Sequence, residues 1–368
     1  MKTDPTKPNN NLPKLPPQVD LKDQRLLLAA LEAGEAIAEL KTMLTMSSRS
    51  ISNTVDLLSP LFVPEAVSSS GVENIITTNN SVYVAKILEE RELNPAEKEA
   101  LNYTDALAGG IHTLLTKGFL ATNDYIKMQG ILEPTKKGLR NITGIQLANP
   151  VTGVVYYTPP EGEARIRDLL KNFEDYFNDD APVHEVFSRM AILHYQFEAI
   201  HPFLDGNGRT GRMLMPLYLM KQGRLPLPVL FISHYILEHR DEYYKKLRDV
   251  TNRGAWTEWI LYITYATTEQ ARYTCQILEK IRRAIGLVKK TVKEKIPSVY
   301  SSELIDFLFS NAYFTQKGFE EEIGVSPMTA RRYLRELEAQ KVVVKQKQNG
   351  KNRYIYITPR YINILRQV

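Results

Sequence analysis

The chain has 368 residues, 43% of them hydrophobic and 24% charged, which is the composition of a folded protein of two or three domains rather than of a disordered chain. Its single cysteine, Cys275, excludes an internal disulfide framework, and no apolar run approaches the roughly 18 residues of a membrane-spanning helix. The net charge of +5 is uneven, because residues 281–368 hold 17 Lys and Arg against 8 Asp and Glu, so we expect the basic C-terminal part to have a role of its own.

The first hundred residues predict a helical region behind a short lead. Residues 1–17 are rich in Pro and Asn and lack the apolar stretch of a signal peptide, so we expect a disordered lead on a cytoplasmic protein without membrane contact. Apolar residues three and four apart predict a helix over 18–59, within an N-terminal helical region at 18–100. A looser stretch with a serine run follows at 60–82, and helices are expected again at 82–108 and 121–132.

One β-hairpin is predicted in the body of the chain. The runs 144–147 and 153–157 read as short strands around the turn Asn149-Pro150-Val151-Thr152. Helical patterns surround this hairpin, so we expect it to project from a mainly α-helical core at 101–290. The helices expected after it are at 163–177, 183–199, 209–221, 239–253 and 256–288.

The C-terminal residues 295–368 predict a winged helix-turn-helix domain. Three helical patterns, at 301–310, 316–323 and 326–340, are followed by two strand-like runs around Asn349-Gly350, a strong hairpin signal. Basic residues lie on the expected recognition helix and wing, which would suit phosphate contacts with DNA; docking of a protein is the alternative. These residues are Arg331, Arg332, Arg335, Lys345, Lys347, Lys351 and Arg353.

The stretch HPFLDGNGRTGR, residues 201–212, carries the chemistry. Pro202 ends the preceding helix, and the Gly206-Asn207-Gly208 turn opens the next one, so backbone N–H groups and the helix dipole form an anion site suited to phosphates. Arg209 and Arg212 lie three residues apart and share a helix face. Asp205 beside a polyphosphate requires a cation, which favours Mg²⁺. His201, with an ordinary pKa near 6.5, can accept a proton at neutral pH.

This stretch resembles the signature of the Fic family, HPFx[D/E]GNGRxxR, at every fixed position. The resemblance implies transfer of AMP from ATP, the co-substrate, to a Ser, Thr or Tyr hydroxyl of a target protein or of the enzyme itself. It makes His201 the catalytic base, Asp205 the Mg²⁺ ligand, and the hairpin at 143–158 a flap that aligns the target by strand addition. The ATP-binding residues that it implies are Gly206, Asn207, Gly208, Arg209, Thr210, Gly211, Arg212, Tyr243 and Tyr244.

A second motif implies autoinhibition. Residues Ser69 to Asn74 fit the family's inhibitory pattern [S/T]xxxE[G/N], in which the glutamate, here Glu73, pairs with the second arginine of the signature, here Arg212. Its position before the signature resembles the class with an N-terminal inhibitory helix. One departure lies on the adenosine side, where relatives have an Asn seven residues after the Tyr-Tyr pair and this chain has Thr251.

Other interpretations stay open on the sequence alone. SxxxEN also fits a capped, solvated helix start at Glu73, and Tyr243 and Tyr244 also fit core aromatics. A His194/His201/Asp205 metal site is disfavoured by Pro202, which leaves His194 as a hydrogen-bonded residue of a buried helix. The chain as a whole also fits a nucleotide-sensing, DNA-binding regulator, or a transferase with another phosphorylated donor. The sequence leaves a homodimer open.

Overall fold

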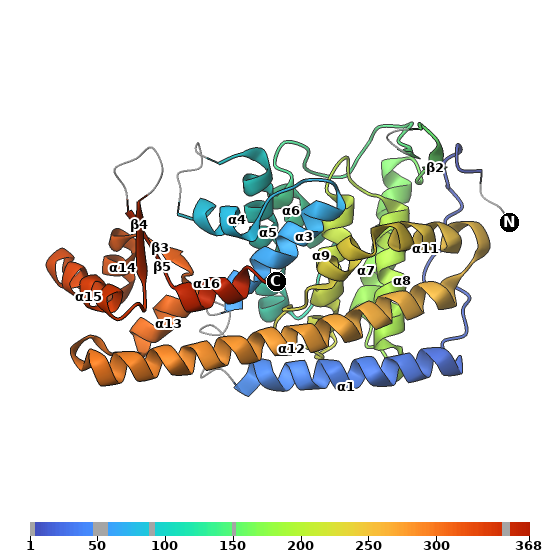
Figure 1. The fold of residues 1–368 in the computed structure, drawn as a ribbon. Coiled ribbons are helices and arrows are strands. Elements are labelled where there is room, and N and C mark those ends of the chain that lie inside the picture. Colours follow the sequence, from blue (N-terminus) through green and yellow to red (C-terminus); the bar gives the residue numbers. More distant parts are fainter. Residues whose placement is uncertain (1–3, 47–57, 88–92, 149–151, 348–353) are drawn as a thin grey trace.

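The computed structural model describes residues 4–46, 58–87, 93–148, 152–347 and 354–368. The described part is mainly α-helical, with one small hairpin in the body and a small sheet in the C-terminal domain, as the sequence predicts (Figure 1). None of its helices is both long and apolar enough to cross a membrane.

The N-terminal lead packs on the body, which corrects the expectation of a disordered segment for residues 4–17. Leu12 and Leu15 are buried in the hydrophobic core. The Leu15 N–H donates to Asn172 Oδ1 at 2.7 Å, and Asn172 Nδ2 donates back to the Leu15 carbonyl at 3.1 Å. These bonds to a distant helix satisfy a segment that makes no regular structure of its own, which the Pro-rich composition does not foretell.

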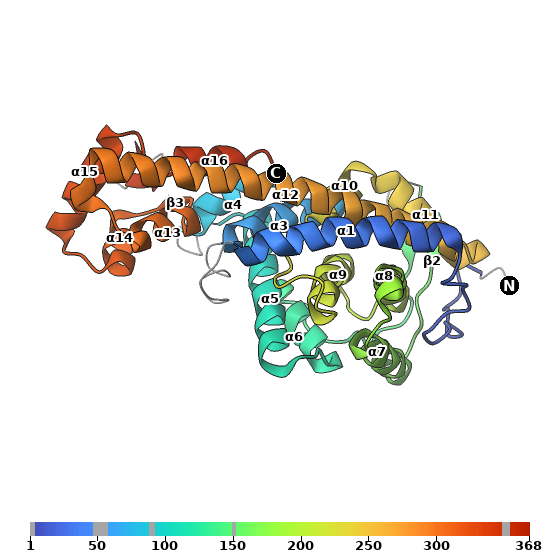
Figure 2. The same cartoon turned by 90° about the horizontal axis from the view of Figure 1, so that it is seen from below.

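Two long helices lie side by side along one face of the molecule (Figures 1 and 2). They are α1 (Gln24–Met46) and α12 (Trp256–Lys295), and α12 continues past the expected end at residue 288 into the C-terminal domain. Each buries an apolar stripe, which includes Leu40 of α1 and Ile263 of α12. The other helices of the body lie on one side of this pair (Figure 1).

The shorter helices of the body include one that was not predicted from the sequence. The stretch expected to be loose contains α3 (Phe62–Val72), whose serines Ser68, Ser69 and Ser70 are buried. This is a correction: serines and a glycine resemble a loop in sequence, but here tertiary contacts override their weak helix propensity. The other helices of the body are α4 (Asn79–Ala85), α5 (Pro95–Lys117), α6 (Thr122–Leu132), α7 (Glu163–Asn178), α8 (Val186–Ile200), α9 (Asn207–Lys221), α10 (Ile232–Glu238) and α11 (Arg240–Arg253), with 3₁₀ turns at Ser59–Leu61 and Val183–Glu185.

The hairpin is confirmed but is shorter than predicted. Strands β1 (Leu147–Ala148) and β2 (Val155–Tyr157) pair antiparallel, with Leu147 opposite Tyr157. The Tyr157 hydroxyl donates to the Ala199 carbonyl at 2.9 Å, which fixes the hairpin base to the end of α8. Three residues of the predicted tip, 149–151, lie outside the described residues.

The C-terminal domain has the predicted helices with a three-stranded antiparallel sheet in the order β3-β5-β4. Two elements were not predicted from the sequence: β3 (Tyr313–Phe314) and the last helix, α16 (Pro359–Leu365), which packs on α12. The wing tip at Asn349-Gly350, with Lys351 and Arg353, lies outside the described residues. The other elements are α13 (Ser302–Ser310), α14 (Gln316–Ile323), α15 (Pro327–Ala339), β4 (Val344–Lys347) and β5 (Tyr354–Ile357), with a 3₁₀ turn at Pro297–Val299.

Candidate active site

His201 stands at the end of α8 in a left-handed backbone conformation, with φ of 48°. Its N–H still closes the last helical turn onto Phe197 at 3.0 Å, and Pro202 then leads the chain away. A left-handed conformation is uncommon for a residue with a side chain, so surrounding contacts must hold it.

Arg140 provides such contacts. Its buried guanidinium donates from Nε to the His201 carbonyl at 2.7 Å, and from Nη2 to the carbonyls of Ile200 and Pro160. The Arg140 N–H also donates to the Pro202 carbonyl at 3.0 Å. The sequence does not reveal this role of Arg140, because no local pattern marks an arginine that binds carbonyls sixty residues away.

His201 is neutral at physiological pH. Burial lowers the pKa of its imidazole to about 4, and the nearby Arg140 guanidinium acts in the same direction. A neutral imidazole has a lone pair that can accept a proton, so His201 has the protonation state required of a general base.

The Gly206-Asn207-Gly208 turn has the geometry of an anion site. Gly206 is left-handed, with φ of 81°, and α9 begins directly after it without a side-chain cap on its first turn. Asn207 stabilises the turn through its side-chain amide, which accepts from the Phe203 N–H at 2.8 Å and donates to the Phe203 carbonyl at 2.9 Å. Uncapped N–H groups at a helix N-terminus attract anions.

Glu73 lies over this turn. A Cβ placed on Gly208 would be 2.3 Å from Glu73 Oε1 and 2.9 Å from Arg212 Nη1. A side chain at position 208 would therefore displace the Glu73 carboxylate, which occupies the space in front of the helix N-terminus.

Arg212 is buried and is held by the end of α3. Its Nη2 donates to Glu73 Oε1 at 2.8 Å and to the Ser69 carbonyl at 2.9 Å, and its Nε donates to Ser69 Oγ at 3.0 Å. Burial opposes the charge on Arg212, but Glu73, Tyr243, Tyr244 and Glu198 together outweigh it, and the pKa of the guanidinium is raised. Arg212 is therefore charged and is held on Glu73 and Ser69.

The segment that fits the inhibitory pattern lies at the C-terminal end of a helix rather than at a helix start. Asn74 follows Glu73 in a left-handed conformation, with φ of 64°, and its Oδ1 accepts from Arg240 Nη1 at 2.6 Å. The N–H groups of Glu73 and Ile75 both donate to the Ser70 carbonyl, which closes α3. The interpretation of Glu73 as a capped helix start is therefore wrong.

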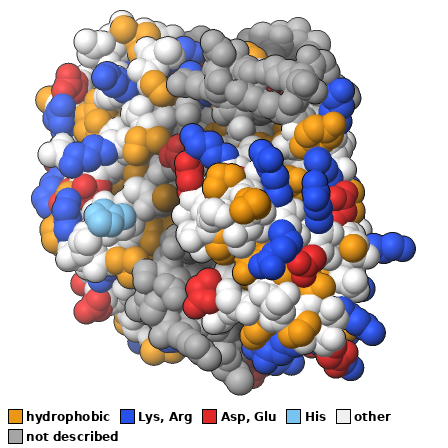
Figure 3. Space-filling model, turned by 90° about the vertical axis from the view of Figure 1, so that its left-hand side faces the viewer, with side chains coloured by type: hydrophobic (Ala, Val, Ile, Leu, Met, Phe, Trp, Pro, Cys, Tyr) orange, Lys and Arg blue, Asp and Glu red, His pale blue; other side chains and the backbone are white. Residues whose placement is uncertain are grey.

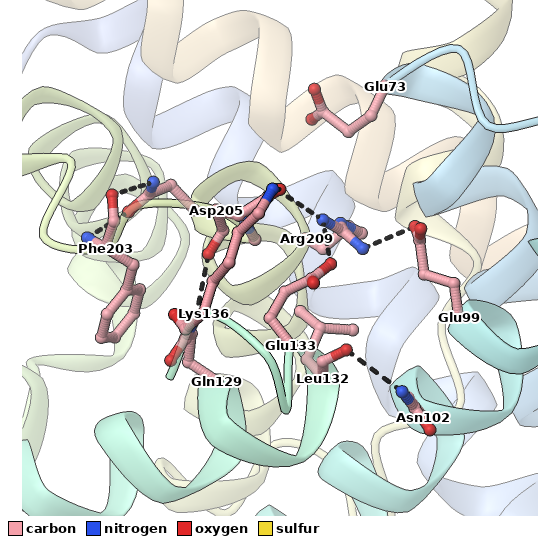
Figure 4. Close-up of polar contacts among 12 residues, drawn as sticks. Glu73, Glu99, Asn102, Gln129, Leu132, Glu133, Lys136, Phe203, Asp205 and Arg209 are labelled. Carbon is pink, nitrogen blue, oxygen red and sulfur yellow. Dashed lines mark hydrogen bonds and ion pairs between the residues drawn. The ribbon is translucent and has the colours of Figure 1, made fainter. Parts of the chain in front are cut away.

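Arg209 is enclosed by three carboxylates (Figure 4). Its guanidinium lies 2.5 Å from Glu99, 2.8 Å from Glu133 and 2.9 Å from Asp205, and the side chain is 2% exposed. The sequence predicts a phosphate ligand at this position. In this structure Arg209 is paired with Asp205 and with the two glutamates, from α5 and the end of α6, and its contact with phosphate stays a prediction.

Asp205 has two cationic neighbours. Lys136 Nζ lies 2.6 Å from its Oδ2, and Arg209 lies against Oδ1, which also accepts from the Gly206 N–H at 2.8 Å. Burial opposes the charge on Asp205, but Lys136 and Arg209 outweigh it and lower the pKa of the carboxyl. The same contact with Asp205 raises the pKa of Lys136.

A protein-only metal cage does not form among the described residues, where no group of three His, Cys, Asp or Glu side chains could hold an ion. His194 is buried and its Nε2 shares a hydrogen bond with the Tyr243 hydroxyl at 2.9 Å, as expected for a structural histidine. Asp205 alone does fit Mg²⁺, which in nucleotide sites is commonly held by one or two carboxylates together with phosphate oxygens. A cation, Lys136, already lies against its outer oxygen.

The remaining predicted ligands divide between the rim and the interior. Tyr243 is 1% exposed and bonded to His194, whereas Tyr244 is only partly buried and is the more accessible member of the pair. Thr210 is buried, and a Cβ on Gly211 would lie 2.4 Å from Glu198 Oε1, which gives Gly211 a packing role between α8 and α9. Thr251, on the adenosine side, bonds the Tyr195 hydroxyl at 2.9 Å.

Sequence profiles of three related domains match this chain. They are the Fic/DOC family at residues 107–219, the Fic/DOC family N-terminal domain at 27–112, and the C-terminal domain of SoFic-like protein adenylyltransferases at 285–361. Together they cover most of the chain, including the helices that carry both motifs.

Known proteins agree with these profiles. Over 147 residues the chain is 35% identical to the protein adenylyltransferase fic-1 of Caenorhabditis elegans, which covers 38% of this chain and 27% of that protein. Over 242 residues it is 27% identical to the protein adenylyltransferase Fic of Aedes aegypti, which covers 64% of this chain and 44% of that protein. The chain thus matches less than half the length of either relative.

Solved structures share the fold. A Fic family protein from Desulfovibrio desulfuricans G20 superposes with a TM-score of 0.53 at 17% identity, over 93% of this chain and 98% of that one. Residues 134–508 of C. elegans Fic-1 superpose with a TM-score of 0.52 at 19% identity, over 70% and 74% of the two chains. With the signature intact and its helices arranged as described, the chain belongs to the Fic/DOC family.

Proposed function

We propose that this protein is a Mg²⁺-dependent protein adenylyltransferase that is autoinhibited by Glu73. It transfers AMP from ATP to a Ser, Thr or Tyr hydroxyl of a target protein or of itself. The observation that carries the proposal is the meeting of three parts at one helix N-terminus: the uncapped first turn of α9, the neutral His201 and the buried Arg212. Both relatives compared above are named protein adenylyltransferases, which supports the same reaction.

In the reaction the target hydroxyl oxygen attacks the α-phosphorus of ATP, and the bond to the pyrophosphate oxygen breaks. His201 accepts the hydroxyl proton on its imidazole, while Arg140 keeps the backbone of His201 in place. The N–H groups at the start of α9 bind phosphate oxygens, and Arg212 supplies positive charge for the leaving pyrophosphate. When bound at Asp205, Mg²⁺ would neutralise charge on the phosphates.

Glu73 opposes this reaction in two ways. Its carboxylate lies where the terminal phosphate would approach Gly208, and it pairs with the arginine needed to bind that phosphate. Because two anions cannot share the site, ATP must either displace Glu73 or bind in an unproductive position. The target, by this proposal, docks on the flap, where β1 and β2 form a sheet of two strands that a third strand can extend.

The test is label transfer with Mg²⁺ from ATP carrying ³²P at the α-position, compared with ATP labelled at the γ-position. The Glu73→Gly variant should label itself or a lysate protein with the α-label only, and Glu73→Gly/His201→Ala should not. Glu73→Gly/His184→Ala is the matched control, because His184 lies at the surface away from the signature. Transfer of the γ-label, or full activity without His201, would contradict the proposal.

A second role in binding DNA is supported by the exposed arginines of α15. Arg331, Arg332 and Arg335 are all exposed, and so are Lys345 and Lys347 on β4. Figure 3 shows, on the end of the molecule that includes this domain, Lys and Arg side chains interspersed with acidic and apolar ones. Retention on duplex DNA that falls steeply with salt and weakens in Arg331→Ala/Arg335→Ala would support this role. Salt-independent retention would favour protein docking.

A further inference from the structure

Lys136 contacts the outer oxygen of the Asp205 carboxylate, the group that would bind Mg²⁺ in the proposed reaction. Its Nζ lies 2.6 Å from Asp205 Oδ2, the oxygen that the Gly206 N–H and Arg209 leave open (Figure 4). An ammonium and a metal ion that contact the same oxygen repel each other at close range, so each weakens the binding of the other.

The backbone that carries Lys136 is tied to the backbone of Asp205. The fully buried Gln129 donates from Nε2 to the Lys136 carbonyl at 3.0 Å and to the Asp205 carbonyl at 3.1 Å, and its Oε1 accepts from the Gly138 N–H at 3.0 Å. One amide thus sets the spacing of the two residues. The Lys136 side chain is 53% exposed, so it can turn away while its backbone stays fixed.

The contact between Lys136 and Asp205 changes the net charge of the carboxylate cluster around Arg209. With all groups ionised, Glu99, Glu133 and Asp205 hold three negative charges, and Arg209 and Lys136 hold two positive ones. Without Lys136 the cluster would carry two uncompensated negative charges and would attract a divalent cation by itself. A nucleotide brings its own phosphates, toward which a displaced lysine can turn.

We propose that Lys136 is a positioning residue that keeps Asp205 occupied until nucleotide arrives, so that the divalent metal enters with the nucleotide and not ahead of it. This inference rests on the proposed function, in which Asp205 holds Mg²⁺. Lys136 acts through Asp205 and takes no part in the chemical step.

The experiment measures Mn²⁺ binding to the nucleotide-free protein, with free Mn²⁺ read from its electron paramagnetic resonance signal. Lys136→Gln should lower the dissociation constant about three- to fivefold, the upper part of the range expected for removing an exposed ion pair that competes for the site. Lys137→Gln is the matched control, because Lys137 is exposed on the same loop and has no contact with Asp205 in the structure. Adding Asp205→Asn to Lys136→Gln should abolish the gain.

Repeating the titration with ATP tests the order of binding. The difference between Lys136→Gln and wild type should then shrink below about twofold, since the lysine has already left Asp205. Unchanged, weaker or undetectable Mn²⁺ binding by nucleotide-free Lys136→Gln would overturn the inference, as would an equal gain with and without ATP. Label transfer by Glu73→Gly, measured in parallel, separates these outcomes from a failure of the proposed reaction.

Discussion

Replacing Glu73 by glutamine removes one charge from the contact with Arg212 while keeping nearly the same side-chain shape. The ion pair is 2.8 Å long, with Arg212 1% and Glu73 34% exposed. Two unit charges about 4 Å apart attract by about 4 kcal/mol at an effective dielectric constant of about 20. The exposure of Glu73 and the cost of keeping Arg212 out of water reduce this to about 1–3 kcal/mol.

That range is the free energy that ATP has to overcome to take Arg212 from Glu73. It corresponds to a rise of about 5- to 150-fold in kcat/KM for ATP. Glu73→Gly should exceed Glu73→Gln, because glycine also clears the space in front of Gly208, where Glu73 Oε1 would lie 2.3 Å from an added Cβ.

The assay is the initial rate of α-³²P incorporation over a range of ATP concentrations. Glu32→Gln, a change on the exposed face of α1, serves as the control for loss of a carboxylate elsewhere and should leave kcat/KM unchanged. If both Glu73 variants stay within twofold of wild type, Glu73 does not restrain ATP binding. A gain in Glu73→Gly alone would mean that steric exclusion, rather than the charge pair, is the brake.

Three further outcomes follow from the site. The neutral form of His201 is the proposed base, and burial lowers its pKa to about 4. We therefore expect kcat/KM to stay level as the pH falls to about 5 and to decline only nearer 4, whereas a decline centred on pH 6.5 would contradict this. Gly211→Ala should lower the free energy of unfolding by about 1–3 kcal/mol, because the added methyl group overpacks the contact with α8. Gly34→Ala should raise the free energy of unfolding by about 0.5–1 kcal/mol, because there is open space around Gly34. Chemical denaturation measures both changes. Tyr243→Phe should lower the free energy of unfolding by about 1–2 kcal/mol, because the hydrogen bond to His194 is lost, and should leave the KM for ATP unchanged. Tyr244→Ala should raise the KM for ATP. A raised KM in Tyr243→Phe would instead indicate that Tyr243 contacts the nucleotide.

The sequence located the signature correctly because its geometry is local. A proline after a helix and a glycine-flanked turn before the next fix where the N–H groups of α9 lie, and His201 follows from the same twelve residues. The helix α3 was harder, since Ser69-Ser70-Gly71 has the composition of a loop and becomes helical only where Arg212 and other partners bury it.

The three carboxylates around Arg209 could not be predicted from the sequence, for a related reason. Spacing places Arg209 on the same helix face as Arg212, but spacing cannot show which partners arrive from other helices. Glu99 comes from α5, more than a hundred residues earlier, and Glu133 from the end of α6. Arg140 could not be identified for a different reason. Its partners are backbone carbonyls, and because every residue has one, no sequence pattern shows which carbonyls an arginine will bind.

Three residues of the site have a left-handed backbone conformation: Gly206, Asn74 and His201. The sequence suggests this conformation for the first two better than for the third. Gly206 is the ordinary solution, because glycine adopts this conformation without strain. Asn74 is the next best residue for it, which gives a physical reason why the inhibitory pattern ends in Gly or Asn: the chain must turn sharply after Glu73 to leave its carboxylate pointing at Arg212. His201 has no such tolerance, so its conformation depends on the carbonyl contacts of Arg140 and on the Pro202 that follows. The strained position is thus the one that carries the proposed base, and the contacts that hold it come from the segment leading into the flap.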